Sequence, residues 1–120
     1  MMSKGKILVV DDEKNIRITV AQALENVGYY VHTAYDGKDA MIQLEEDEYD
    51  LIITDYKMPG MNGMKLLKKA TEMYPEIKIA MITAHGSVEN AVEAMKIGAV
   101  DFLQKPFTPR EIRDLVYNIL

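Results

Sequence analysis

The sequence predicts a single α/β domain in which five parallel strands alternate with five helices. Two observations lead to this prediction. Short apolar runs alternate five times with apolar residues at helical spacing, the pattern of consecutive β-α-β units. The chain has 120 residues, the size of one ordinary domain, and no linker, low-complexity tract or internal repeat divides it. Residues 1–120 are therefore expected to form one domain.

The composition excludes several classes of function. Hydrophobic residues make up 48% of the chain, but no apolar run approaches the roughly 20 residues of a membrane span. The absence of cysteine excludes thiol catalysis, disulfides and cysteine-ligated metals. A net charge of −5 argues against direct binding of nucleic acid by this segment. The N-terminus lacks the apolar core of a signal peptide, so a cytoplasmic location is expected.

The first two strands are predicted over residues 6–10 and 30–35. The helix between them ends near Gly28, which stands where a left-handed glycine commonly follows a helix. Asp36 and Gly37 then turn the chain into a short second helix. The core-facing residues of these helices are Ile16, Val20, Leu24 and Val27 in the first and Ala40, Met41 and Leu44 in the second.

The third strand, residues 51–55, is apolar on both faces and ends at Asp55, just before a Pro-Gly turn. A third helix over residues 63–73 begins after Asn62, its expected N-cap, and stops before Pro75. Its core-facing residues are Leu66, Leu67, Ala70 and Met73.

The last two strands are predicted over residues 77–83 and 100–105. The helix between them is expected to be capped by Ser87 and to end at Gly98. A capping box with proline at its first helical position, residues 108–111, marks the start of the fifth helix. Core-facing residues are Val88, Ala91, Val92 and Met95 in the fourth helix and Ile112, Leu115, Val116 and Ile119 in the fifth. Four methionines on core-facing patterns are interpreted as filling the core: Met41, Met73, Met81 and Met95.

The polarity of the strands indicates their order. Strands 6–10, 51–55 and 77–83 are apolar on both faces, whereas 30–35 and 100–105 mix polar and apolar residues. The order 2-1-3-4-5 places the mixed strands at the edges. This is the known order of doubly wound flavodoxin-like folds such as that of CheY, so the prediction matches the chain to an existing template.

Chemically useful side chains follow the carboxyl ends of four strands, which meet at one edge of a parallel sheet. Three carboxylates placed together repel one another by about 4 kcal/mol per pair at 4 Å, so they either take up protons or surround a cation. Oxygen ligands without cysteine or nearby histidine suit Mg²⁺. An aspartate can accept a phosphoryl group, and a hydroxyl and an ammonium group can contact its oxygens. The residues are Asp11, Asp12, Asp55 as the nucleophile, Thr83 and Lys105.

Each of these residues also has a structural interpretation. Asp11 or Asp12 could be the N-cap of the first helix. Thr83 could simply end a strand, and Lys105 could be a solvated surface lysine, although Pro106 forces an extended backbone on it. The joint placement of these residues, rather than any one of them, favours a site.

Five motifs occur together: residues 7–12, Asp55 with residues 58–63, residues 82–84, Gly98-Ala99 and residues 105–107. With them the chain from Lys6 to Leu120 resembles the receiver domains of two-component response regulators. The likeness is greatest to stand-alone sporulation-type receivers and to the receivers of NtrC-like transcription regulators. Leu120 falls inside the last helix and no linker is visible, so the chain is expected to be either a single-domain receiver or the receiver of a longer regulator, with the second favoured.

The resemblance implies the roles of the site residues. Asp55 would be the phosphoacceptor, and Thr83 and Lys105 would contact the phosphoryl group. Mg²⁺ would be bound by Asp11, Asp12, Asp55 and the backbone carbonyl of Lys57. Also implied are a cis bond between Lys105 and Pro106, a switch aromatic at Phe102, and control of the acyl-phosphate lifetime by Lys57 and His85.

The resemblance also implies partners. A histidine kinase or phosphotransfer protein would donate the phosphoryl group, and an output domain or downstream protein would respond to a changed surface on the fourth helix, fifth strand and fifth helix. A phosphorylation-dependent homodimer is common in such proteins. The domain would assist only its own phosphorylation and dephosphorylation, and so would not be an enzyme with a separate substrate.

Two other classes share part of this pattern. A Mg²⁺-dependent phosphohydrolase with an aspartyl nucleophile usually places that residue after the first strand, as Asp-x-Asp, and adds a cap domain. A flavin-binding domain of similar topology needs a phosphate-binding loop after the first strand, where residues 11–15 would instead repel a phosphate.

Overall fold

Five parallel strands form one sheet in the order β2-β1-β3-β4-β5, as the match to the flavodoxin-like template predicted. The computed structural model describes residues 4–58, 60–84 and 88–120. Predicted and observed strand ends differ by at most one residue, which is the ordinary uncertainty of such boundaries. The strands are β1 (Lys6–Val10), β2 (Tyr30–Ala34), β3 (Leu51–Asp55), β4 (Lys78–Thr83) and β5 (Asp101–Gln104).

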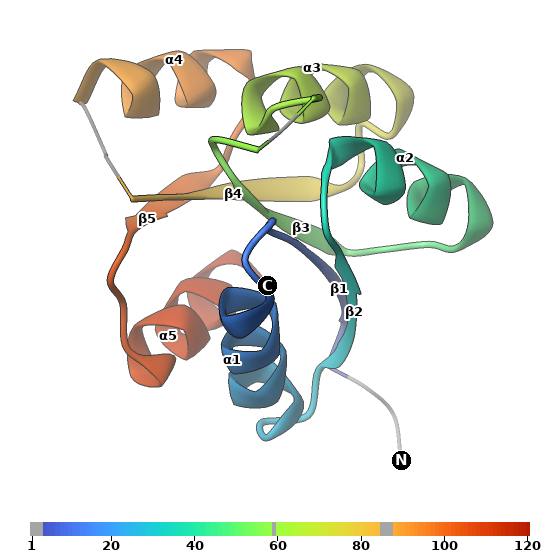
Figure 1. The fold of residues 1–120 in the computed structure, drawn as a ribbon. Helices are drawn as coiled ribbons and strands as arrows, with labels where there is room; N and C mark the ends of the chain where they lie inside the picture. The colour runs from blue at the N-terminus through green and yellow to red at the C-terminus, as the bar shows by residue number, and fades with distance from the viewer. Residues whose placement is uncertain (1–3, 59, 85–87) are drawn as a thin grey trace.

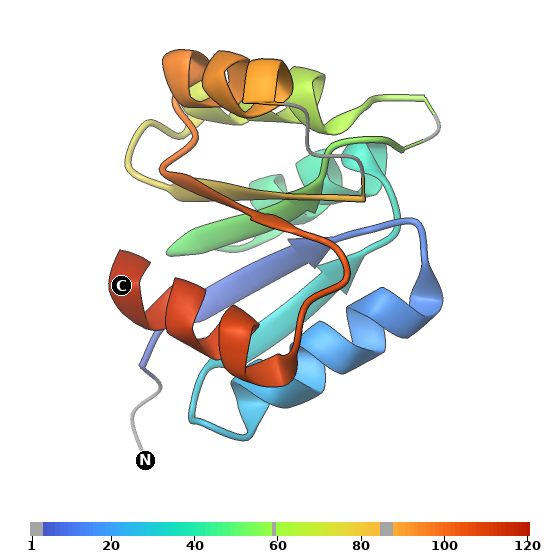
Figure 2. The same cartoon turned by 90° about the vertical axis from the view of Figure 1, so that its left-hand side faces the viewer.

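Helices cover both faces of the sheet (Figure 1). Helices α1 (Lys14–Glu25) and α5 (Pro109–Ile119) lie on one face. Helices α2 (Gly37–Glu46), α3 (Gly63–Met73) and α4 (Val88–Ile97) lie on the other, and the view in Figure 2 shows the same three layers. Among the described residues, no helix has the length and apolar character needed to cross a membrane.

Alternate residues of the central strands enter two separate cores. In β1, Leu8 and Val10 face the core under α2, α3 and α4, whereas Ile7 and Val9 face the core under α1 and α5. All four are fully buried. A strand buried on both faces must be apolar at every position, which explains the continuous apolar runs. The carboxyl ends of these strands are therefore held between two close-packed cores.

Capping residues place several helix starts as predicted. Asn62 accepts a hydrogen bond from the Lys65 N–H, and Thr108 forms both halves of the predicted capping box with Glu111. The prediction for Gly28 is only partly right, since it has a φ of +101° but lies two residues beyond Asn26, the C-cap of α1. The predicted cap at Ser87 lies outside the described residues.

The predicted core face of α4 is wrong at Val92 and Met95, and the side chain of Val88 lies outside the described part of the structure. Ala94 is the residue that is buried, while Val92 and Met95 are each 45% exposed. Met73 at the end of α3 is also exposed, whereas Met81 is buried as predicted. The apolar residues of α4 form two stripes, and periodicity alone cannot distinguish the stripe that faces the core. The exposed stripe lines an apolar groove of about 420 Å³ with Phe102 of β5.

Candidate functional site

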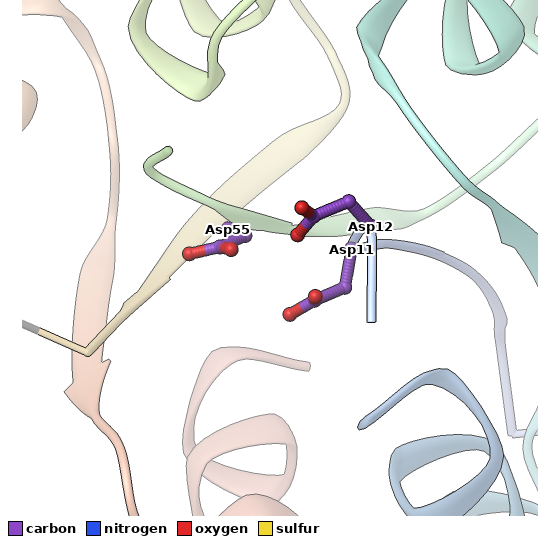
Figure 3. A group of neighbouring side chains, drawn as sticks. All are labelled: Asp11, Asp12 and Asp55. Carbon is purple, nitrogen blue, oxygen red and sulfur yellow. The ribbon is translucent and has the colours of Figure 1, made fainter. Parts of the chain in front are cut away.

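Three carboxylates meet at the carboxyl end of the sheet (Figure 3). Asp55 is the last residue of β3, and Asp11 and Asp12 follow β1, its neighbour in the sheet. One oxygen from each carboxylate lies within 4.8 Å of the others. Asp11 and Asp55 are buried, and Asp12 is exposed. The predicted meeting of Asp55 with Asp11 and Asp12, which lie far from it in the sequence, is therefore present in the structure.

Lys105 is part of this cluster and is not a solvated surface lysine. Its Nζ lies 2.9 Å from Asp11 Oδ2, 3.4 Å from Asp55 Oδ2 and 3.8 Å from Glu13 Oε1. Only 9% of its side chain is exposed. The peptide bond between Lys105 and Pro106 is cis, as the resemblance implied. One buried ammonium group thus faces two buried carboxylates.

The loop after Asp55 is fixed by a close approach of the backbone. The carbonyl of Tyr56 accepts a hydrogen bond from the Gly63 N–H at 2.9 Å. A Cβ on Gly63 would lie 2.1 Å from the Asp55 carbonyl oxygen, so only glycine fits here. The buried hydroxyl of Thr54 donates to the same oxygen at 3.1 Å. These contacts hold the backbone of Asp55 in place independently of its carboxylate.

Burial and like charge raise the pKa values of the two buried carboxyl groups. Burial raises the pKa of Asp55, the Asp11 carboxylate raises it further, and Lys105 opposes both. Burial also raises the pKa of Asp11, against the Glu13 N–H and Lys105. For Lys105, burial alone would lower the pKa, but the Asp11 and Asp55 carboxylates raise it. The charges of this site are thus incompletely balanced.

The alternative that Asp11 or Asp12 caps α1 is not supported. The N-cap residue of α1 is Glu13, which makes no side-chain capping bond. Asp11 Oδ1 instead accepts a hydrogen bond from the Glu13 N–H at 2.8 Å, and the Arg17 guanidinium donates to the Asp11 carbonyl at 2.8 Å. Sequence reasoning missed Glu13 and Arg17. The sequence offers one signal for a role of these two residues, which is position: Glu13 directly follows Asp12, and Arg17 lies near the start of α1.

The remaining predicted residues come from β4, β5 and the loop after β3. Thr83 ends β4, and the residue before it, Ile82, pairs in register with Asp55. The Thr83 carbonyl accepts a hydrogen bond from the Lys105 N–H at 2.7 Å. Phe102 in β5 is 41% exposed. Lys57 lies just past β3 and is exposed, and the role of its carbonyl remains a prediction. His85 lies outside the described residues.

The carboxylate cluster fits a hard cation. Its side-chain donors are all oxygens, which hard divalent ions prefer. Asp11 Oδ2 is buried and accepts no hydrogen bond from the described residues, although Lys105 lies beside it as an ion partner. Three carboxylates also exceed the one buried lysine in charge. A bound cation would satisfy both the free lone pairs and the excess charge.

Comparison with known proteins relates the chain to response regulators. The family model described as the response regulator receiver domain matches residues 7–117. The chain is 37% identical over 119 residues to the response regulator protein PilR of Pseudomonas aeruginosa, which is 99% of this chain and 27% of PilR. It is 46% identical over 108 residues to the transcriptional regulatory protein ZraR of Salmonella typhimurium, which is 88% of this chain and 24% of ZraR. The chain thus spans about a quarter of the length of these relatives.

Solved structures agree with the fold. The chemotaxis protein CheY4 of Vibrio cholerae superposes with a TM-score of 0.93 at 34% identity, with all of both chains covered. NtrX of Brucella abortus superposes with a TM-score of 0.93 at 35% identity, over 99% of this chain and 27% of NtrX. The chain is similar both to a single-domain protein and to one part of a longer regulator.

Proposed function

Because the chain belongs to the response regulator receiver family, a family of signalling domains, we propose that Asp55 accepts a phosphoryl group from a histidine kinase or a phosphotransfer protein. The observation that carries this proposal is the buried triangle of Asp55, Asp11 and Lys105. It combines a carboxylate nucleophile, a place for a cation and an ammonium group at one end of the sheet.

In the proposed reaction a carboxylate oxygen of Asp55 attacks phosphorus in the phosphohistidine of the partner. A P–O bond forms as the P–N bond breaks, and the electron pair leaves with the imidazole. Lys105, 3.4 Å from Asp55 Oδ2, is placed to bind an oxygen of the transferring group. Thr83, which ends the adjacent strand β4, would donate its hydroxyl to another.

The cation of this site would be Mg²⁺. Asp11, Asp12 and Asp55 would hold it, together with the backbone carbonyl of Lys57. When bound, Mg²⁺ offsets negative charge on the attacking carboxylate and the phosphoryl oxygens. Lys105, which pairs with Asp11 and Asp55, would share these two carboxylates with the cation.

Phosphorylation would switch a surface on α4, β5 and α5. Thr83 would move toward the phosphoryl group, and Phe102 would turn inward to fill the space. Moving a population from 1:99 to 99:1 requires about 5.5 kcal/mol. Hydrogen bonds from Thr83 and Lys105 to a charged group contribute roughly 1.5–3 kcal/mol each, which is most of that amount. The exposed groove beside Phe102 supports this surface as the one that an output domain, a downstream protein or a second copy contacts.

As in the family, the domain would catalyse only its own phosphorylation and dephosphorylation, and residues 1–120 would act as one unit in the cytoplasm. A Mg²⁺-dependent phosphohydrolase is not favoured, since the receiver model matches nearly the whole chain.

The test is phosphorylation by acetyl phosphate in the presence of Mg²⁺, followed by intact-mass spectrometry. The parent and an Asp47→Asn control, which removes an exposed carboxylate elsewhere, are expected to gain one phosphoryl group. Asp55→Asn is expected to gain none. Uptake by Asp55→Asn at the rate of the parent would show that another residue is the acceptor.

A further inference from the structure

The backbone of Tyr56, the residue directly after Asp55, is held by two other elements. Its N–H donates to the Ile82 carbonyl of β4 at 2.9 Å, and its carbonyl accepts from the Gly63 N–H of α3 at 2.9 Å. Ile82 immediately precedes Thr83. A displacement of Asp55 or of the end of β4 therefore reaches Tyr56 through one covalent bond or one hydrogen bond.

The side chain of Tyr56 extends this connection to α4. Its half-buried ring packs against the core that lies under α2, α3 and α4. Its hydroxyl donates to Asn90 Oδ1 at 3.4 Å, 34 residues along the chain. Tyr56 and Asn90 both line a groove of about 460 Å³. Residues of α3 and α4, which Figure 1 shows side by side, line the same groove. Tyr56 thus contacts β4, α3 and α4 at once.

We propose that Tyr56 is a positioning residue of the phosphorylation switch, whose hydroxyl holds α4 through Asn90 in the unphosphorylated arrangement. The inference rests on the proposed function of Asp55. In this structure Lys105 pairs with Asp55 and Phe102 is exposed, the arrangement expected before phosphorylation. The bond between Tyr56 and Asn90 is present in that same arrangement.

A bond that stabilises one of two states opposes the transition to the other. Removing the Tyr56 hydroxyl would weaken only the unswitched state and would raise the fraction of molecules in the switched state. The apparent affinity for a ligand that binds the switched state rises in the same proportion. The net contribution of one hydrogen bond corresponds to a change of about two- to tenfold.

The experiment measures binding of beryllium fluoride with Mg²⁺, a phosphoryl mimic, by isothermal titration calorimetry. Tyr56→Phe keeps the ring and its packing but removes the hydroxyl, and it is expected to bind the mimic about two- to tenfold more tightly than the parent. The matched control is Tyr74→Phe. Tyr74 is also half-buried against the same core, at the far end of α3, and its variant is expected to bind as the parent does.

A double-mutant cycle links the effect to Asn90. Asn90→Ala should also tighten binding, and the double variant should bind no more tightly than the tighter of the two single variants, since one interaction is removed once. An unchanged affinity of Tyr56→Phe, an equal gain in Tyr74→Phe, or fully additive effects would each overturn the inference. If the parent itself failed to bind the mimic, the proposed function would fail first.

Discussion

The sheet carries a lysine–carboxylate cluster at each end, and the two differ in burial and in charge balance. At the carboxyl end, Lys105 is 9% exposed and faces Asp11 and Asp55, which are buried. At the amino end, the side chain of Lys6 pairs with Asp47 and is 24% exposed. Its ammonium group also lies over two tyrosine rings, 5.1 Å and 5.5 Å from their centroids.

The comparison separates an exposed, stabilising ion pair from a buried cluster with unbalanced charge. The pair at the amino end is balanced and solvated, so its carboxylate is stabilised and the pKa of Asp47 is lowered, chiefly by the hydrogen bond from Lys6. At the carboxyl end, burial raises the pKa values of both carboxyl groups despite Lys105. A buried cluster with excess negative charge weakens the fold, and its presence is expected where a cation and a phosphoryl group bind.

The largest expected effect comes from removing the ammonium group of Lys105. Lys105→Met keeps the length of the side chain but leaves Asp11 and Asp55 without a positive partner. Breaking a buried ion pair typically costs about 3–5 kcal/mol, and we expect a loss near the lower limit because the carboxyl groups can take up protons. Urea unfolding of metal-free protein at neutral pH measures it. A midpoint equal to that of the parent would show that the cluster is solvated.

The second largest expected effect is a gain in stability caused by Asp55→Asn. Without metal, Asp55→Asn removes one of two like charges that share a single lysine, so the free energy of unfolding should rise by about 1–2 kcal/mol. Saturating Mg²⁺ should stabilise the parent more than the variant and reduce the difference. The same urea titration in chelator and in Mg²⁺ checks both statements, and a destabilised variant in chelator would contradict the charge argument.

The pH dependence of that gain has a definite sign. Because the folded-state pKa values of Asp11 and Asp55 are raised from 3.8, the folded state holds more protons than the unfolded state at mildly acidic pH. This contribution to stability is complete below pH 3.8 and is lost as the pH rises through the raised values. The advantage of Asp55→Asn over the parent should therefore shrink as the pH is lowered from 7 toward 4.

The sequence predicted the fold and the meeting of Asp11, Asp12, Asp55 and Lys105, but not the charge balance among them. Strand polarity is a local signal that indicated the edge strands, and the known flavodoxin-like template supplied their order. The Asn62 and Thr108 caps are local signals that predicted two helix starts. The burial of Lys105 depends on how the residues after β5 approach Asp11 and Asp55 at the ends of β1 and β3, which no local pattern encodes. The exposed stripe on α4 was misassigned because Val92 and Met95 repeat at core-like spacing.

The smallest expected effect is at the amino end of the sheet, where Asp47→Asn breaks the pair with Lys6. The pKa of Asp47 is lowered, so the stability that this pair adds is present above pH 3.8 and is lost as the pH falls through the folded-state value. Asp47 is exposed, and solvent and salt screen it. The urea midpoint at neutral pH and physiological salt should therefore stay close to that of the parent and should drop slightly only at low salt. The sign is opposite to that of Asp55→Asn, although both variants remove one negative charge. If both variants stabilised the protein equally, net charge would explain the data and burial would not.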